Sequence, residues 1–134
     1  MGIQDLETAK YLLSTRKPLP IGIVCYLSQQ ATEKALKSIL YNQYKEVPFH
    51  HKILDLLDLV NQEDDIISLD EKDALRMTRF AIRVRYYDNR LDVTEKDAEY
   101  AVNKASSVVK QVQIFLDNCN CQSDESPTPP SPLP

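Results

Sequence analysis

Glycine is almost absent from this chain of 134 residues: only Gly2 and Gly22 occur, and both precede its main body. Antiparallel sheets normally need glycine in their hairpin turns, so this scarcity argues against a sheet protein. Leu, Ala, Lys, Glu and Gln dominate the middle of the chain and favour helices instead. We therefore expect an all-α protein, and the length suits one domain.

The chain also lacks long apolar runs, and its number of cysteines is odd. No stretch of 18 apolar residues occurs, so we expect no membrane-spanning helix. The opening MGIQDLETAK has acidic residues where a secretory signal would have a basic region followed by an apolar one. Three cysteines, Cys25, Cys119 and Cys121, fit free thiols. Together these features predict a cytoplasmic protein.

Motifs of common chemistries are also lacking. The chain has no Gly-rich phosphate loop, no HExxH and no GxSxG. Its only histidines are the adjacent His50 and His51, and no further ligands follow at metal-binding spacing. The CNC sequence at 119–121 has no partner cysteines. We therefore expect neither a metal nor a cofactor.

Apolar residues at helical spacing predict five helices. They cover residues 3–14, 21–44, 51–62, a stretch from an N-cap at Ser68 to Tyr87, and 95–118, the last capped by Thr94 with Asp97 three residues on. The predicted fold is an up-and-down four- or five-helix bundle over residues 1–118. Residues 119–134 hold five of the eight prolines and predict a disordered Pro/Ser-rich tail.

Two of these helices have clear apolar stripes. The second carries one made of Val24, Leu27, Ala31, Ala35 and Ile39, widened by Ile23, Leu36 and Leu40. The fifth has a heptad-like seam made of Ala98, Ala101, Ala105, Val108, Val112 and Phe115. In the fourth helix the predicted inward residues are Met77, Phe80, Ala81, Val84 and Tyr87. Small residues at Ala31 and Ala35 would let another helix approach closely.

Arginine is concentrated in one place although the net charge is −4. Five of the six arginines, Arg76, Arg79, Arg83, Arg85 and Arg90, fall within fifteen residues. Arg76, Arg79 and Arg83 share one face of the fourth helix, and Tyr86 extends it. Forked guanidinium donors suit phosphate or carboxylate. The alternative is a solvated face paired with acids of neighbouring helices such as Asp55, Asp58 or Glu99.

Three segments resemble the HEPN domain family (higher eukaryotes and prokaryotes nucleotide-binding domain). The stretch IVCYLSQQATEKALKSIL (23–40) resembles its signature helix, with the pattern Cys-aromatic-x-x-Gln-Gln-Ala-x-Glu-Lys-x-Leu-Lys. HKILDLL (51–57) is similar to its His-x-Leu-x-x-Leu segment, and RYYD with TEKDAEYA (85–101) to its Arg-Tyr-x-Asp segment before the last helix. The order and spacing agree over about residues 5 to 116.

The resemblance implies a helical bundle, usually a homodimer, associated in prokaryotes with small nucleotidyltransferase proteins in toxin–antitoxin-like modules. It implies one of two functions: a metal-independent ribonuclease with an Arg-x4-6-His motif, or a non-catalytic module that binds nucleotides or other anions. Here no histidine follows an arginine of the fourth helix, and the corresponding positions after Arg79 hold Val84, Arg85 and Tyr86. Because histidine is the usual proton carrier near neutral pH, this departure weighs against an enzyme.

We therefore expect a non-catalytic module that binds a nucleotide or another phosphate-bearing ligand, ahead of RNA. We also expect it to form a homodimer that acts as the partner of a nucleotidyltransferase-like protein. The expected site residues are Arg79, Arg83, Arg85 and Tyr86 on one wall of a groove, with Gln30, Glu33 and Lys34 on the other. Two alternatives stay open: a toxin-like ribonuclease with an atypical Arg/Tyr site, and a protein-interaction bundle whose arginines only form ion pairs, for example with Glu33.

Overall fold

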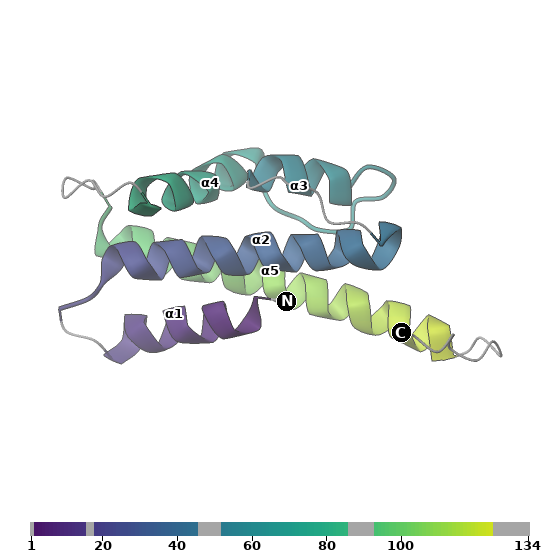
Figure 1. Ribbon diagram of the computed structural model, residues 1–134, viewed down its shortest axis with the longest axis horizontal. Helices are drawn as coiled ribbons and strands as arrows, with labels where there is room; N and C mark the ends of the chain where they lie inside the picture. The colour runs from purple at the N-terminus through teal and green to yellow at the C-terminus, as the bar shows by residue number, and fades with distance from the viewer. Residues whose placement is uncertain (1, 16–17, 46–51, 86–92, 125–134) are drawn as a thin grey trace.

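A computed structural model of the chain describes residues 2–15, 18–45, 52–85 and 93–124. These residues form five helices and no strand, which confirms the all-α prediction (Figure 1). The helices are α1 (Ile3–Thr15), α2 (Ile21–Tyr44), α3 (Ile53–Val60), α4 (Glu71–Arg85) and α5 (Glu95–Asp124). None of them is long and apolar enough to cross a lipid bilayer.

The four longer helices run in alternating directions along the chain, as expected for an up-and-down bundle (Figure 1). The short α3 is inserted between α2 and α4, on the same side of the molecule as α4. α2 is central and contacts all the other described helices. α1 lies on one side of α2, and α3 and α4 lie on the other (Figure 1).

The core contact is between α2 and α5, which run side by side in the same direction (Figure 1). Both helices carry small buried residues, which let helix backbones approach closely. The buried residues of the predicted stripes are Val24, Ala31, Ala35 and Ile39 on α2 and Ala98, Ala101, Ala105, Val108 and Val112 on α5. Leu27 and Phe115, which were predicted to belong to the stripes, are partly buried and pack against the core.

One residue of the predicted α2 stripe lies outside it. Ile23 is 53% exposed, whereas Leu36 and Leu40, predicted with it, are buried. Ile23 precedes Tyr41 by 18 residues, which is five whole helical turns, so the two side chains lie on the same side of α2. Tyr41 is 56% exposed, so this side of α2 faces solvent near both of its ends. The prediction for Ile23 was therefore wrong.

α1 packs against α2 through a glycine. A Cβ placed on Gly2 would lie 2.6 Å from the Cα of Ala31, which is closer than real side chains come. The missing side chain therefore allows the start of α1 to touch the backbone of α2.

The helix ends confirm one predicted cap and correct another. Before α5, the backbone N–H of Thr94 donates to an Asp97 carboxylate oxygen (2.8 Å) and the N–H of Asp97 donates to the Thr94 hydroxyl (3.3 Å), a reciprocal cap. Ser68 does not cap α4, which begins at Glu71. The backbone N–H of Ser68 instead donates a hydrogen bond to the side-chain oxygen of Gln111 on α5, and the side-chain NH2 of Gln111 donates one to the Ser68 carbonyl.

α5 continues six residues past the predicted end at Asn118, as far as Asp124, the last described residue. The first residue that cannot continue a helix is Pro127, so nothing in the intervening sequence terminates it. The predicted end of this helix is thus corrected from residue 118 to residue 124. The disordered tail stays a prediction, and residues 125–134 lie outside the described residues.

Candidate anion-binding helix and the polar ladder that holds it

α4 carries most of the arginine cluster and is anchored by its apolar face. Ala74, Met77 and Phe80 are buried beneath it. Ala81 and Val84 continue this spacing, but their side chains and Tyr87 lie outside the described residues. Of the five clustered arginines, the structure describes the side chains of Arg76 and Arg79, and these two differ sharply.

Arg76 is bound to α5. Its guanidinium forms an ion pair with Asp97 and lies over the ring of Tyr100, 3.8 Å from the ring centre. The hydrogen bond from Arg76 to Asp97 raises the pKa of Arg76 further. Burial by itself would raise the pKa of Asp97, but the Thr94 backbone N–H and Arg76 outweigh it and leave that pKa below its usual value. Arg76 is therefore a fixed cation whose charge is matched.

Tyr100 links α5 to three residues of α4. Its ring stacks against Arg76, its hydroxyl donates a hydrogen bond to Asp73, and its ring meets that of Phe80 edge-on, with centres 6.4 Å apart. Burial and the bond to Asp73 raise the pKa of Tyr100 to about 12. The hydrogen bond from Tyr100 lowers the pKa of Asp73, so this tyrosine stays protonated and this aspartate ionised near neutral pH.

Lys104 completes the arrangement by pairing with Asp73 at 3.1 Å. We call the set of Asp97, Arg76, Tyr100, Asp73 and Lys104 the α4–α5 ladder. Its charges alternate in sign along the two antiparallel helices, so each charged group has an opposite neighbour. Cys25 of α2 lies near the ladder: burial, followed by the charge of Asp97, raises the pKa of its thiol to about 12. At neutral pH this thiol is protonated and unreactive.

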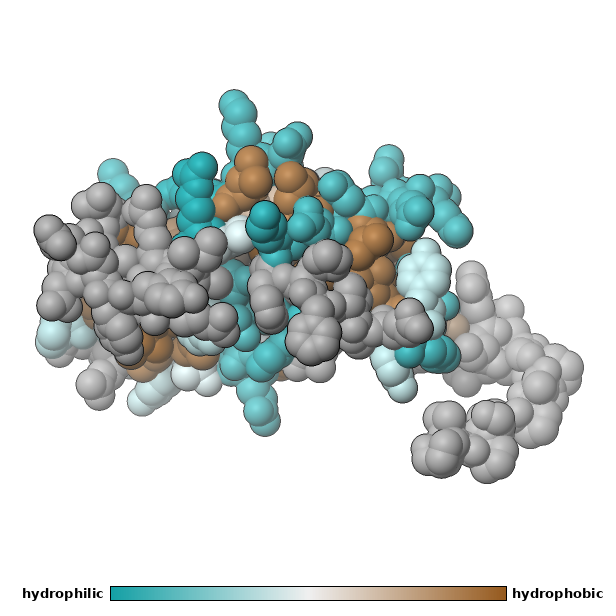
Figure 2. All heavy atoms as spheres, turned by 45° about the horizontal axis from the view of Figure 1, so that its top comes forward, coloured by the Kyte–Doolittle hydropathy of each residue, from teal (hydrophilic) through white to brown (hydrophobic). Residues whose placement is uncertain are grey.

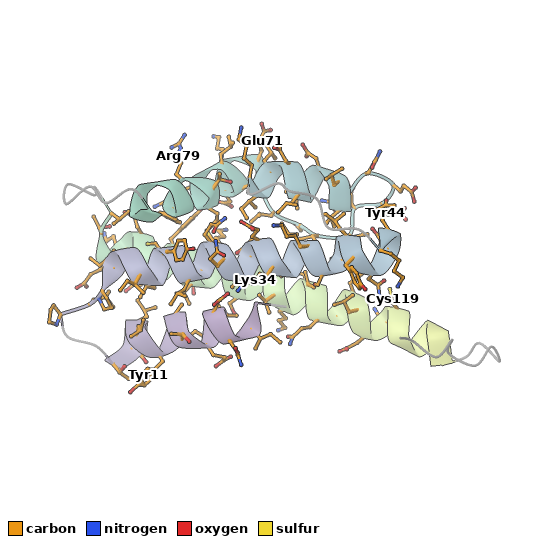
Figure 3. The ribbon with its side chains drawn as sticks, viewed as in Figure 1. Tyr11, Lys34, Tyr44, Glu71, Arg79 and Cys119 are labelled. Atoms are coloured by element: carbon orange, nitrogen blue, oxygen red, sulfur yellow. The ribbon has the colours of Figure 1, made fainter. Side chains whose placement is uncertain are left out.

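Arg79 lies one turn further along α4 and has no such partners. Its side chain is exposed and projects away from the bundle (Figure 3). Within the described part of the chain it makes no hydrogen bond or ion pair. The face formed by α3 and α4 carries hydrophilic side chains with apolar ones among them (Figure 2). Arg79 is therefore a free guanidinium that an anion in solvent can reach.

Arg83 also belongs to α4, four residues after Arg79, and Arg85 is its last residue. The side chains of both, and Tyr86, lie outside the described residues. Because Arg79 and Arg83 are four residues apart in α4, their backbone positions lie on one face of the helix.

Gln30 and Glu33 of α2, predicted for the opposite wall, belong to a chain of hydrogen bonds within that helix. The amide of Gln30 donates to buried Gln29 (2.9 Å), Gln29 donates to Glu33 (3.2 Å), and Lys37 pairs with the other Glu33 oxygen (2.9 Å). Glu33 is only 5% exposed. Each of its carboxylate oxygens thus already accepts a bond from α2 itself.

Lys34, the third residue of that wall, lies away from α4. Its ammonium pairs with Asp5 of α1 at 2.7 Å. α1 and α4 lie on opposite sides of α2, so Lys34 and Arg79 are not brought together (Figure 3).

The sequence alone did not indicate the ladder. The ion-pairing alternative named Asp55, Asp58 and Glu99 as partners, and the acid that pairs with Arg76 is Asp97. A usable signal exists on α5: Asp97, Tyr100 and Lys104 each immediately precede one of the seam alanines, Ala98, Ala101 and Ala105. They therefore form a second stripe, 100° around the helix from the seam.

The described residues contain no group of three or more His, Cys, Asp or Glu side chains placed to hold a metal ion. The model of the HEPN domain family matches residues 1–115 of the chain. No curated protein and no solved structure matches the chain.

Proposed function

The chain belongs to the HEPN domain family, and on that premise we propose that it is a non-catalytic module that binds a nucleotide or another phosphate-bearing ligand on the outer face of α4. Arg79 carries this proposal, because it is exposed and has no partner among the described residues. A free guanidinium on a helix surface offers forked donors to a phosphate without first breaking an ion pair. We include Arg83 in the proposed site because it follows Arg79 by four residues on the same helix.

The non-catalytic part of the proposal rests on the missing histidine. No histidine follows an arginine of α4 in the sequence. Metal-independent RNA cleavage needs a group that exchanges a proton near neutral pH, and arginine does not. We extend the proposal to the module's context: a cytoplasmic homodimer of prokaryotic type that acts with a nucleotidyltransferase-like protein. Resemblance to the family is the support for that extension.

A thermal-shift screen of the purified protein tests the ligand. ATP, ADP, GTP, short RNA and inorganic phosphate are compared on the wild type, Arg79→Ala and Lys110→Ala. Lys110 is the matched control, because it is an exposed cation on α5 without a partner in the described part. A ligand that binds only the native state, at about a hundredfold excess over its Kd, raises the free energy of unfolding by about 2.7 kcal/mol.

We expect a nucleotide to stabilise the wild type and the Lys110 variant, and Arg79→Ala to lose most of that shift. Equal shifts in all three proteins, or none with any ligand, would contradict the proposal. RNA cleavage that disappears in Arg79→Ala would replace it with the ribonuclease alternative.

A further inference from the structure

α4 is held on both flanks, and this fixes the direction in which Arg79 points. On the α3 flank, the backbone N–H of Ile53 donates to the hydroxyl of Thr78 (2.8 Å), which in turn donates to the carbonyl of Ala74 (3.0 Å). On the α5 flank lies the α4–α5 ladder. The two flanks enclose the apolar face of α4 that packs on the core.

The ladder adds directional restraints on the rotation of α4 to the packing of its apolar face. The hydrophobic effect is itself non-directional. Hydrogen bonds and ion pairs need defined angles and distances. Tyr100 contacts Asp73, Arg76 and Phe80, which span two turns of α4, so a rotation that improved one contact would weaken the others.

Arg79 lies within the span that Tyr100 holds. It falls between Arg76 and Phe80 along α4, and its side chain leaves the helix toward solvent (Figure 3). A change in the rotation of this turn would therefore swing the guanidinium of Arg79 relative to the rest of the surface. Arg76 cannot make the same contribution to an external anion, because Asp97 already matches its charge and Tyr100 covers one face of its guanidinium.

We propose that Tyr100 and Arg76 are positioning residues for the anion site: the ladder that they form with Asp73, Asp97 and Lys104 sets the orientation of α4 and so presents Arg79 to the ligand. In this arrangement the arginine cluster is divided by role, with Arg76 facing inward to hold the helix and Arg79 facing outward to bind. The inference rests on the proposed function, because it concerns the same site.

A double-mutant cycle tests the coupling between Tyr100 and Arg79. Tyr100→Leu removes the hydroxyl and the stacked ring without changing the charge, and Tyr100→Phe removes only the hydroxyl. Tyr11→Leu is the matched control, since Tyr11 is 60% exposed on α1 and its ring and hydroxyl have no partner among the described residues. The affinity for inorganic tripolyphosphate is measured by titration calorimetry at a temperature at which circular dichroism shows every variant fully helical.

We expect Tyr100→Leu to weaken tripolyphosphate binding about fivefold, within the coupling range of residues in one network. Tyr100→Phe should fall between that variant and the wild type because it keeps the ring contacts, and Tyr11→Leu should bind as the wild type does. In an Arg79→Ala background, Tyr100→Leu should cause no further loss, because the side chain that it positions is gone.

Four outcomes overturn parts of this account, and they are distinguishable. Loss of binding in Arg79→Ala with normal binding in Tyr100→Leu overturns the positioning role alone. An equal loss from Tyr100→Leu in both backgrounds also overturns it, because Tyr100 would then act independently of Arg79. Absence of binding in the wild type, or normal binding in Arg79→Ala, overturns the proposed function and this inference with it.

Discussion

α5 has two sides that are built in opposite ways. The side that packs on α2 is a seam of buried small residues, Ala98, Ala101, Ala105, Val108 and Val112. The side toward α4 carries Asp97, Tyr100 and Lys104, which reach across to α4 by ion pairs, a stacked ring and a hydrogen bond. The first joins helices by close backbone approach, and the second joins them by long side chains.

The difference shows how one helix can serve both stability and presentation. The small-residue seam belongs to the buried apolar core, and removal of that core from water is the main stabilising contribution to folding. The ladder is partly exposed, so its ion pairs contribute little net stability. Its contacts are directional, however, and they fix the helix that carries Arg79. We therefore expect substitutions in the seam to change the free energy of unfolding, and substitutions in the ladder to change mainly the orientation of α4.

The largest effect is expected from overfilling the seam. Ala105→Leu places three extra carbon atoms where α2 and α5 meet and Ala105 is fully buried. Overpacking of this kind costs about 3 kcal/mol. Urea denaturation followed by circular dichroism measures the change.

Asn103→Leu is the control for the added leucine, because Asn103 is exposed on the same helix. It should change the free energy of unfolding by less than about 0.5 kcal/mol. Similar losses in the two variants would show that the seam is not tightly packed and would remove the contrast between the two sides of α5.

A smaller effect, specific to the ladder, is expected from acid. The folded pKa of Asp73 lies below its ordinary value of 3.8, so its contribution is present above that value and is lost as the pH falls through the folded pKa. Asp73→Asn lacks this contribution. At neutral pH the variant should unfold at a lower urea concentration than the wild type, and the gap should close as the pH falls below about 4.

Urea midpoints measured over a series of pH values test this. Asp58→Asn serves as a reference, because Asp58 is an exposed acid of α3 that has no partner in the described part. That variant should differ little from the wild type at neutral pH. A gap for Asp73→Asn that stays constant from neutral to acidic pH would argue against a charge-dependent ladder.

The smallest effect is expected outside both sides of α5, at the C-terminus of α2. Lys45 adopts a left-handed conformation there (φ 59°), which favours glycine. Lys45→Gly should raise the free energy of unfolding by about 0.5–1 kcal/mol. Because Lys45 also lies over the ring of Tyr41, Lys45→Ala controls for loss of its side chain. Urea denaturation measures both variants. If Lys45→Ala raises the free energy of unfolding by as much as Lys45→Gly does, relief of backbone strain is not the cause.

Local sequence patterns were sufficient for much of the fold. The α2 boundaries, 21–44, agree with the prediction, and so does the start of α5 at Glu95, because Pro20 and the reciprocal Thr94 and Asp97 cap mark these ends within a few residues. Errors arose where an end is set by a distant contact. Serine is a residue type that commonly caps helices. The backbone of Ser68, however, forms hydrogen bonds with the side chain of Gln111, which is 43 residues away.

The candidate site was less predictable, because a helical wheel shows which residues share a face but not what lies opposite. Arg76 and Arg79 looked equivalent on such a wheel. In the structure Arg76 meets Asp97 and Tyr100 of another helix, whereas Arg79 meets solvent. Lys34 adjoins Glu33 in the sequence, but the 100° between them on α2 directs Lys34 to Asp5 of α1.

The sequence by itself determined the helical class, the apolar stripes of α2 and α5 and the concentration of arginine, because composition and the 3.6-residue period are properties of the chain alone. Only the tertiary structure decided which arginine is matched and which is free. An ion pair depends on distance and direction between groups far apart in sequence, and those are set when the apolar faces pack and bring α4 and α5 together.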